Sequence, residues 1–207
     1  MRLPDHLLIA TTNADKLREI RSLLTSVPLI ALADIPSVPE PEETGETFDA
    51  NARLKALYYD LHLHDTTHPS GTIWTVAEDS GFVVDALNGE PGVRSARFVR
   101  PDASYPERFD EIYRRLAGHG ASQRSARFVC ALAVARDGQI VFETTGTIEG
   151  LVADVPHGRG GFGYDPIFHY PPYGTTLAEV SQEEKLAVAH RGQAFRALER
   201  WLRGLGG

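Results

Sequence analysis

The chain has 207 residues, of which 42% are hydrophobic, and its formal net charge at pH 7 is -7. This length and hydrophobic content are sufficient for a buried core, and they fit a single two-lobed domain, residues 1–207, better than two independent domains. The acidic balance argues against broad DNA or RNA binding, which usually depends on a basic face, although a local basic pocket can still bind a small anion. No stretch approaches the roughly 18 uninterrupted apolar residues of a membrane span and the start has no signal-peptide layout, so we expect a cytoplasmic protein without membrane partners.

The amino-terminal part predicts a strand, a helix and a second strand. Residues 6–12 are typical of a buried strand, and Asn13 is of a type that caps a following helix. The expected inner face of that helix consists of Leu17, Ile20, Leu23 and Leu24. A short strand near 29–32 then precedes a Pro/Glu-rich connection, IPSVPEPEETGE.

A second helix is expected to begin near Thr47. Its predicted apolar stripe comprises Ala50, Leu54, Leu57, Tyr58 and Leu61. Its other face carries Thr47, Asn51 and Lys55 at four-residue steps, so that these three side chains point the same way.

The remaining chain predicts strands and two more helices. The expected strands cover residues 72–78, 82–87, 93–98, 126–135 and 139–148. A helix is expected near 106–117, and the last helix begins at a capping box formed by Ser181 and Glu184. The buried stripe of the last helix comprises Phe195, Leu198, Trp201 and Leu202. These elements together predict an α/β fold with a mixed sheet flanked by helices.

Histidine and cysteine give only weak signals. The stretch HLHDTTHPSG, residues 62–71, looks like a solvated loop, and its histidines lack the helical spacing or further ligands of a metal site. These histidines are His62, His64 and His68. The single cysteine, Cys130, lies in the apolar run FVCALAVA and is interpreted as a small buried hydrophobe, because reactive thiols need a polar, partly exposed setting.

The loop TTNADK, between the first strand and the first helix, is a candidate phosphate site. Free backbone N–H groups and the positive end of the helix dipole would face a ligand there, together with the side chains of Thr11, Thr12, Asn13 and Lys16. The P-loop pattern G-x-x-x-x-G-K-[ST] is absent. A capped helix with a surface lysine therefore stays open as the alternative.

The stretch TVAEDSGFVVDA places Glu78 and Asp79 side by side at the expected carboxyl end of a strand. Acidic residues are poor strand formers and like charges repel, so folding alone does not favour this step. Carboxylates coexist best beside a divalent cation, and Mg²⁺ takes a few oxygens from the protein and the rest from water and phosphate. We therefore expect Glu42 and Asp79 to be Mg²⁺ ligands and Asp79 to accept a proton from the attacking water.

Two further patches favour a bound ligand. In the glycine-dense PHGRGGFGYDPIF, Phe162 offers a stacking face and Asp165 an acceptor, whereas a surface turn would explain only the glycines. The stretch EKLAVAHRGQAF is expected early in the last helix, where cations work against the helix dipole. Its cations are Lys185, His190 and Arg191.

Five stretches occur in one order over residues 8–195: ATTNADKLREI, EETGETFDANARLKA, EDSGFVVDALNGEPGVRSARF, GGFGYDPIF and AEVSQEEKLAVAHRGQA. In this order they resemble the inosine/xanthosine triphosphate pyrophosphatases, which remove deaminated purine nucleotides. The resemblance implies hydrolysis between the α and β phosphates, giving a monophosphate and pyrophosphate with Mg²⁺. It also implies an elongated mixed sheet in two lobes with a central substrate cleft, and a homodimer.

The resemblance also implies residue roles. Asp79 would be the general base, and Glu42 and Asp79 would hold the metal. The candidate substrate-binding residues are Thr11, Thr12, Asn13, Ala14, Asp15, Lys16, Asn51, Lys55, Ser80, Phe162, Gly163, Tyr164, Asp165, Lys185, His190 and Arg191. Two positions depart from the common bacterial pattern: Glu78 replaces a frequent Asp, and Ala189 replaces the Ser that usually precedes the His-Arg pair.

Hydrogen bonds predict the choice of base. Arg191 at O6 and Asp165 at N1–H would accept hypoxanthine or xanthine and reject adenine, because adenine reverses both groups. Guanine matches at both positions, and nothing in the sequence explains how it is excluded. Two other functions stay open: a nucleotide sensor without turnover, and an enzyme that cleaves modified pyrimidine or methylated nucleoside triphosphates.

Overall fold

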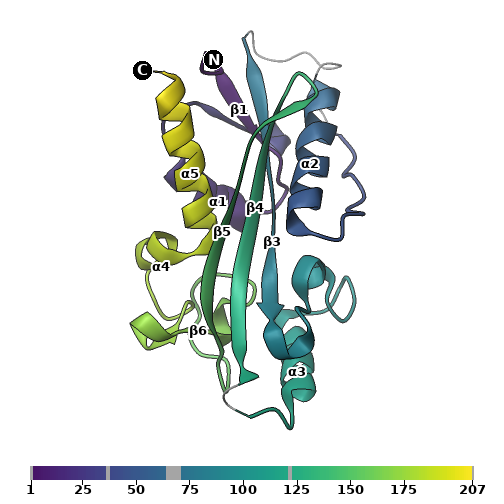
Figure 1. Cartoon of the computed structure of the whole chain (residues 1–207), viewed down its shortest axis with the longest axis vertical. Coiled ribbons are helices and arrows are strands. Elements are labelled where there is room, and N and C mark those ends of the chain that lie inside the picture. Colours follow the sequence, from purple (N-terminus) through teal and green to yellow (C-terminus); the bar gives the residue numbers. More distant parts are fainter. Residues whose placement is uncertain (1, 36–37, 64–70, 121–122, 207) are drawn as a thin grey trace. The chain divides into compact units, whose positions relative to one another are not determined.

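The computed structural model describes residues 2–35, 38–63, 71–120 and 123–206 (Figure 1). The chain forms two compact units. Unit 1 comprises Met1–Asp79, Cys130–Gly146 and Arg191–Gly207, and unit 2 comprises Ser80–Val129 and Thr147–His190. None of the described helices is both long and apolar enough to cross a membrane.

The described strands form one sheet in the order β2-β1-β3-β4-β5-β6-β7. The strands are β1 (His6–Ile9), β2 (Leu29–Ala31), β3 (Ile73–Val84), β4 (Ser125–Arg136), β5 (Gln139–Val152), β6 (Phe168–Tyr170) and β7 (Thr175–Thr176). Strand β1 pairs in parallel with β2 and β3, whereas β6 pairs antiparallel with β5 and β7. The α-helices are α1 (Ala14–Leu23), α2 (Phe48–Leu63), α3 (Tyr105–Leu116), α4 (Gln182–Val188) and α5 (His190–Leu205). The predicted α/β fold with a mixed sheet is confirmed.

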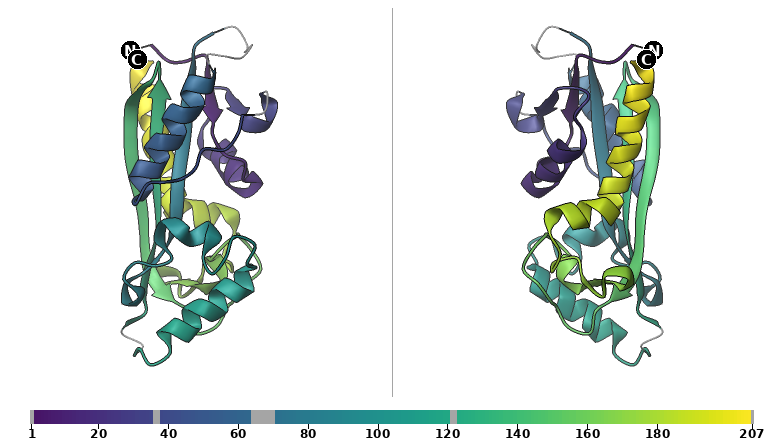
Figure 2. Two further views of the ribbon diagram at one scale, coloured as in Figure 1. Left: turned by 90° about the vertical axis from the view of Figure 1, so that its right-hand side faces the viewer. Right: turned by 90° about the vertical axis from the view of Figure 1, so that its left-hand side faces the viewer.

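In unit 1, helices cover both faces of the sheet (Figure 2). Successive strand residues face opposite sides, so Leu7 and Ile9 pack with α1 and α5, while Leu8 packs in a separate cluster with α2. Burial on both faces explains why the first strand is a continuous apolar run.

In unit 2, aromatic side chains dominate the core. Phe82 stacks on Tyr164 with ring centroids 5.1 Å apart, and Phe128 lies 4.8 Å from Phe168. The Tyr164 hydroxyl donates a 2.8 Å hydrogen bond to the backbone oxygen of Ser95. Helix α3 adds apolar side chains to the same core.

Several predicted elements are confirmed. Asn13 caps α1, the first β-strand and the short second strand are present, and α3, β4 and β5 lie where the pattern placed them. Strands β3, β4 and β5 are longer than expected, and each contains residues of both units.

Three boundaries differ from the prediction. The expected strands 72–78 and 82–87 are one strand, β3, so the acidic step lies in its middle and not at a carboxyl end. Residues 93–98 are not a strand, because Gly92–Arg97 forms a 3-10 helix whose Ser95 hydroxyl accepts a 2.8 Å hydrogen bond from the backbone N–H of Phe82. The last helix is divided at Ala189 into α4 and α5.

The apolar stripe predicted for α2 is confirmed only in part. Leu57 and Tyr58 are partly buried against the core, whereas Leu61 is 57% exposed. The buried apolar residues of the helix are Ala52, Ala56 and Tyr59, and the small alanines let it approach the sheet closely. His62 belongs to α2, whereas His64 and His68 lie outside the described residues.

Candidate active site

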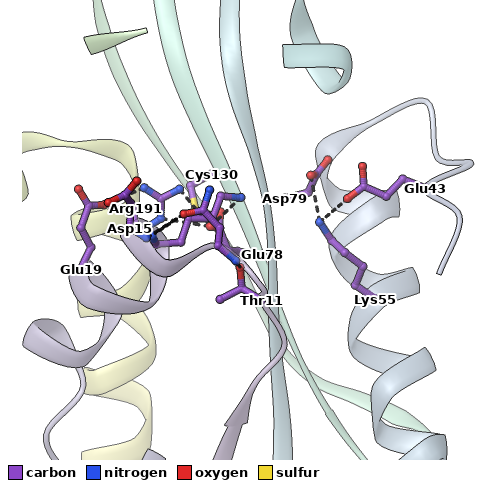
Figure 3. A network of polar contacts seen from close by, with 11 residues as sticks. Thr11, Asp15, Glu19, Glu43, Lys55, Glu78, Asp79, Cys130 and Arg191 are labelled. Carbon is purple, nitrogen blue, oxygen red and sulfur yellow. Dashed lines mark hydrogen bonds and ion pairs between the residues drawn. The ribbon is translucent and has the colours of Figure 1, made fainter. Parts of the chain in front are cut away.

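The candidate active site of unit 1 is built around the acidic step on β3. Glu78 and Asp79 are 4% and 6% exposed, respectively. As neighbours on a strand they project to opposite faces, Glu78 toward α1 and α5 and Asp79 toward α2 (Figure 3). The two carboxylates therefore have separate sets of partners.

On its side of β3, Asp79 lies in a polar group with Asn51 and Lys55 of α2 and with Glu43, which precedes that helix. Lys55 Nζ lies 3.1 Å from Asp79 Oδ1 and 2.7 Å from Glu43 Oε1, so the ammonium group bridges two carboxylates. Asn51 Nδ2 donates a 3.1 Å hydrogen bond to Asp79 Oδ2, and its own Oδ1 accepts one of 2.8 Å from the Gly45 N–H. As their four-residue spacing predicts, Asn51 and Lys55 share one face of the helix.

These contacts set the protonation of Asp79. Burial raises the pKa of the Asp79 carboxyl, and Glu43 raises it further, while Lys55 and the Asn51 hydrogen bond lower it. The net effect is a pKa raised from its ordinary value. Burial alone would lower the pKa of Lys55, but Asp79 and Glu43 raise it, so the ammonium stays charged. A carboxylate with a raised pKa is a better proton acceptor than an ordinary aspartate.

The Glu78 face is richer in cations. Glu78 Oε1 accepts hydrogen bonds from Arg191 Nε and Nη2, at 3.1 and 3.0 Å, and forms an ion pair with Lys16 Nζ at 3.1 Å. Arg191 Nη1 donates to Glu19 Oε2 at 2.7 Å. The Cys130 thiol donates to Glu78 Oε2 at 3.2 Å. Burial alone would raise the pKa of Glu78, but Arg191 and Lys16 hold it well below its usual range.

The TTNADK loop uses several of its polar groups internally. Asn13 Oδ1 accepts hydrogen bonds from the N–H groups of Asp15 and Lys16, at 2.9 and 3.0 Å, so two N–H groups expected to face a ligand are already capped. The Thr12 hydroxyl donates to Glu40 at 2.8 Å, and the Thr11 hydroxyl accepts from the Asn13 N–H. Ala14 is exposed at the start of α1. From this loop, Lys16 is the side chain that reaches the Glu78 face.

A second group of predicted residues lies in unit 2. Asp165 Oδ2 accepts a 2.6 Å hydrogen bond from Lys185 Nζ and one of 2.8 Å from the Phe162 N–H. Lys185 Nζ also lies 4.5 Å from the centre of the Phe162 ring, a cation–π contact. A Cβ on Gly161 would lie 2.2 Å from Asp165 Oδ2, so glycine is required there for this close approach.

The other predicted residues of unit 2 have different surroundings. The His190 ring stacks on Phe128 with centroids 4.9 Å apart, and Tyr164 is a buried core residue. Ser80 is half-buried on β3, and Gly163 adopts a φ of 67°. Lys185 lies in the last turn of α4, where the helix dipole stabilises a cation, so the argument from an unfavourable helix start does not apply to it.

Sequence reasoning assigned no site role to Glu19 or Cys130, and it left open whether Glu43 touches the metal. The structure brings Glu43 to Lys55, whereas Glu42 is exposed. Nothing in the sequence distinguishes these adjacent glutamates. Glu19 is buried although it lies next to, and not within, the apolar stripe of α1, because successive helix residues point about 100° apart. The pattern therefore offered no signal for it.

Comparison with known proteins shows the family of the chain. Residues 7–201 match the Ham1 family. A dITP/XTP pyrophosphatase of Geobacillus kaustophilus is 42% identical over 204 residues, covering 97% of this chain and 96% of the relative. A HAM1 protein structure from Coxiella burnetii superimposes with a TM-score of 0.85 at 36% identity, covering 96% of this chain and 98% of the other. A nucleoside-triphosphatase / dITP/XTP pyrophosphatase structure from Mycobacterium abscessus gives a TM-score of 0.73 at 38% identity, covering 93% and 98% of the two chains. The chain belongs to the Ham1 family.

Proposed function

We propose that the protein is a hydrolase that cleaves dITP, XTP and ITP to the monophosphate and pyrophosphate, with Mg²⁺, and so removes deaminated purine nucleotides. The names of its relatives support the dITP and XTP substrates. The observation that carries the proposal is Asp79, a buried carboxylate with a raised pKa held between Asn51 and Lys55.

Asp79 is proposed to accept the proton of the attacking water. The Asn51 amide and the Lys55 ammonium each bind one of its oxygens, so the carboxylate is oriented before the substrate arrives. On the other face of β3, Lys16 is proposed to bind the triphosphate, because a compact ammonium on a flexible stem is suited to phosphate oxygens.

The oxygen donors of the Asp79 face fit Mg²⁺, which prefers carboxylate oxygens. Asp79 and Glu43, with Glu42 as the family resemblance implies, are the residues proposed to hold it. Among the described residues no three His, Cys, Asp or Glu side chains form a ready metal site, so water and substrate phosphate would supply most ligands. When bound, Mg²⁺ would neutralise charge that develops on the phosphates.

Base selection is proposed for Arg191 and the unit 2 group. Asp165 is an acceptor suited to the N1–H of hypoxanthine and xanthine, and Phe162 offers a ring for stacking. Carboxylates bind all three guanidinium nitrogens of Arg191, which holds the group rigidly for the proposed contact with O6. We further propose a cytoplasmic homodimer with purine nucleoside triphosphates as its small-molecule partners.

Pyrophosphate release with Mg²⁺ tests the proposal on dITP, ITP, XTP, GTP, ATP and dUTP in parallel. We expect the deaminated purines to be cleaved far faster than the others. The Asp79→Asn variant should fold normally and lose activity by about two to four orders of magnitude. Asp137→Asn is the control, since Asp137 is an exposed turn residue with φ of 52°, a conformation that asparagine tolerates. Normal turnover in Asp79→Asn would refute the role of Asp79, and preference for dUTP would refute the substrate class.

A further inference from the structure

Cys130 has a setting that the proposed reaction does not explain. It is fully buried on β4, and its thiol points at the Glu78 carboxylate (Figure 3). Burial raises the pKa of the thiol well above its usual range, and the neighbouring Glu78 charge raises it further. The sulfur therefore keeps its proton and acts as a hydrogen-bond donor.

The two oxygens of Glu78 have different partners. The cations Arg191 and Lys16 gather on Oε1, whereas the thiol binds Oε2 at 3.2 Å. A carboxylate bound at both oxygens cannot rotate without losing one set of contacts. Through Glu78, the thiol is thus linked to one cation from α1 and one from α5.

We propose that Cys130 is a positioning residue for substrate binding: its thiol holds Glu78 in the orientation that places Lys16 and Arg191 to meet the nucleotide. This inference rests on the proposed function, in which Lys16 binds the triphosphate and Arg191 the base. It assigns no chemical step to the sulfur, and it differs from the interpretation of Cys130 as a mere space-filling residue.

Serine and alanine substitutions separate positioning from packing. Serine keeps a hydrogen-bond donor but places a more polar atom in the core, whereas alanine keeps the apolar character and removes the donor. If Cys130 only fills space, Cys130→Ala should be closer to wild type than Cys130→Ser. If its thiol positions Glu78, Cys130→Ser should be closer to wild type in substrate binding than Cys130→Ala. Cys130→Val is a second donor-free variant, for use if the cavity left by alanine prevents folding.

The experiment measures KM, kcat and Tm for dITP hydrolysis in these variants. We expect Cys130→Ala to raise KM about 3- to 10-fold with kcat within about twofold, and Cys130→Ser to keep KM within about twofold of wild type. Val134→Ala is the control, because Val134 is fully buried on the same strand and in the same apolar cluster as Cys130. It should lower Tm and leave KM unchanged.

The outcomes are decisive in either direction. An unchanged KM in both donor-free variants, or an equal rise in the serine and alanine variants, would overturn the positioning role. Absence of dITP cleavage by wild type would instead overturn the proposed function. Calorimetric affinity for inorganic tripolyphosphate, measured in the same variants, would then decide the inference: weaker binding in Cys130→Ala than in Cys130→Ser supports it, and equal binding refutes it.

Discussion

Glu78 and Asp79 are adjacent, equally buried carboxylates that the protein treats in opposite ways. Two cations, Arg191 and Lys16, hold the pKa of Glu78 well below its usual range. Asp79 has Lys55 as its close cation and Glu43 as a competing anion, and its pKa is raised. In this protein the balance of cations and anions around each buried carboxylate distinguishes a structural charge, Glu78, from a group suited to proton transfer, Asp79.

The same comparison explains why β3 tolerates the acidic step. Each carboxylate is balanced on its own face of the sheet, by Lys16 and Arg191 on one and by Lys55 on the other. Mg²⁺ and a triphosphate are therefore not required to account for the folding of the strand.

The largest expected effect on stability separates the two carboxylates. Glu78→Gln removes the charge that compensates buried Arg191, and we expect the free energy of unfolding to fall by about 3–5 kcal/mol. Asp79→Asn should change it by less than about 1 kcal/mol, because its charged form is already disfavoured by burial. Urea unfolding monitored by circular dichroism measures both. A similar fall in the free energy of unfolding in both variants would contradict the different roles assigned to Glu78 and Asp79.

The dependence of stability on pH should also differ in sign. The pKa of Glu78 is lower in the folded state, so its stabilisation is present above the unfolded pKa of about 4.5 and is lost as the pH falls through the lower folded pKa. The pKa of Asp79 is higher in the folded state, so its contribution is greatest below about 3.8 and is lost as the pH rises through the folded pKa. Unfolding of wild type, Glu78→Gln and Asp79→Asn between pH 3 and 7 tests both signs, and parallel curves would contradict them.

The pH profile of activity tests which neighbours raise or lower the pKa of Asp79. Lys55 lowers the pKa of Asp79 and Glu43 raises it. We therefore expect the acid limb of kcat/KM to move to higher pH in Lys55→Gln and to lower pH in Glu43→Gln. Glu143→Gln, a change in the surface ion pair with Arg53, is the control and should leave the limb in place. Movement in the same direction in both variants would refute the assigned partners.

The smallest effect concerns the helix that carries Lys16 to the Glu78 face. Asn13→Ala removes the acceptor for the N–H groups of Asp15 and Lys16 and should lower the free energy of unfolding by about 1 kcal/mol. Asn13→Ser keeps a capping oxygen and should lose clearly less in the same urea experiment. Equal losses would mean that the cap is not what stabilises the start of α1.

Much of the local structure could be predicted because it depends on neighbours in the chain. The Asn13 cap and the Ser181 capping box involve residues two or three positions apart, and both are present. The same holds for the four-residue spacing of Asn51 and Lys55. The buried face of α2 was predicted only in part, because it depends on which side of the helix the sheet meets: Ala52 and Ala56 are buried, Leu57 is partly buried and Leu61 is exposed.

By itself, the sequence determined the α/β class, most helices and strands, the order of the five motifs and the polar residues available for chemistry. Only the tertiary structure decided their partners: Arg191 binds Glu78 across 113 positions and Glu19 across 172, and Glu43 rather than Glu42 meets Lys55. Hydrophobic periodicity indicates which face of many elements is buried, although it failed in part for α2, and it carries no information on which buried charges meet in the core. That pairing follows from the packing of distant segments, and here it makes one neighbour of the acidic step a structural charge and the other the candidate base.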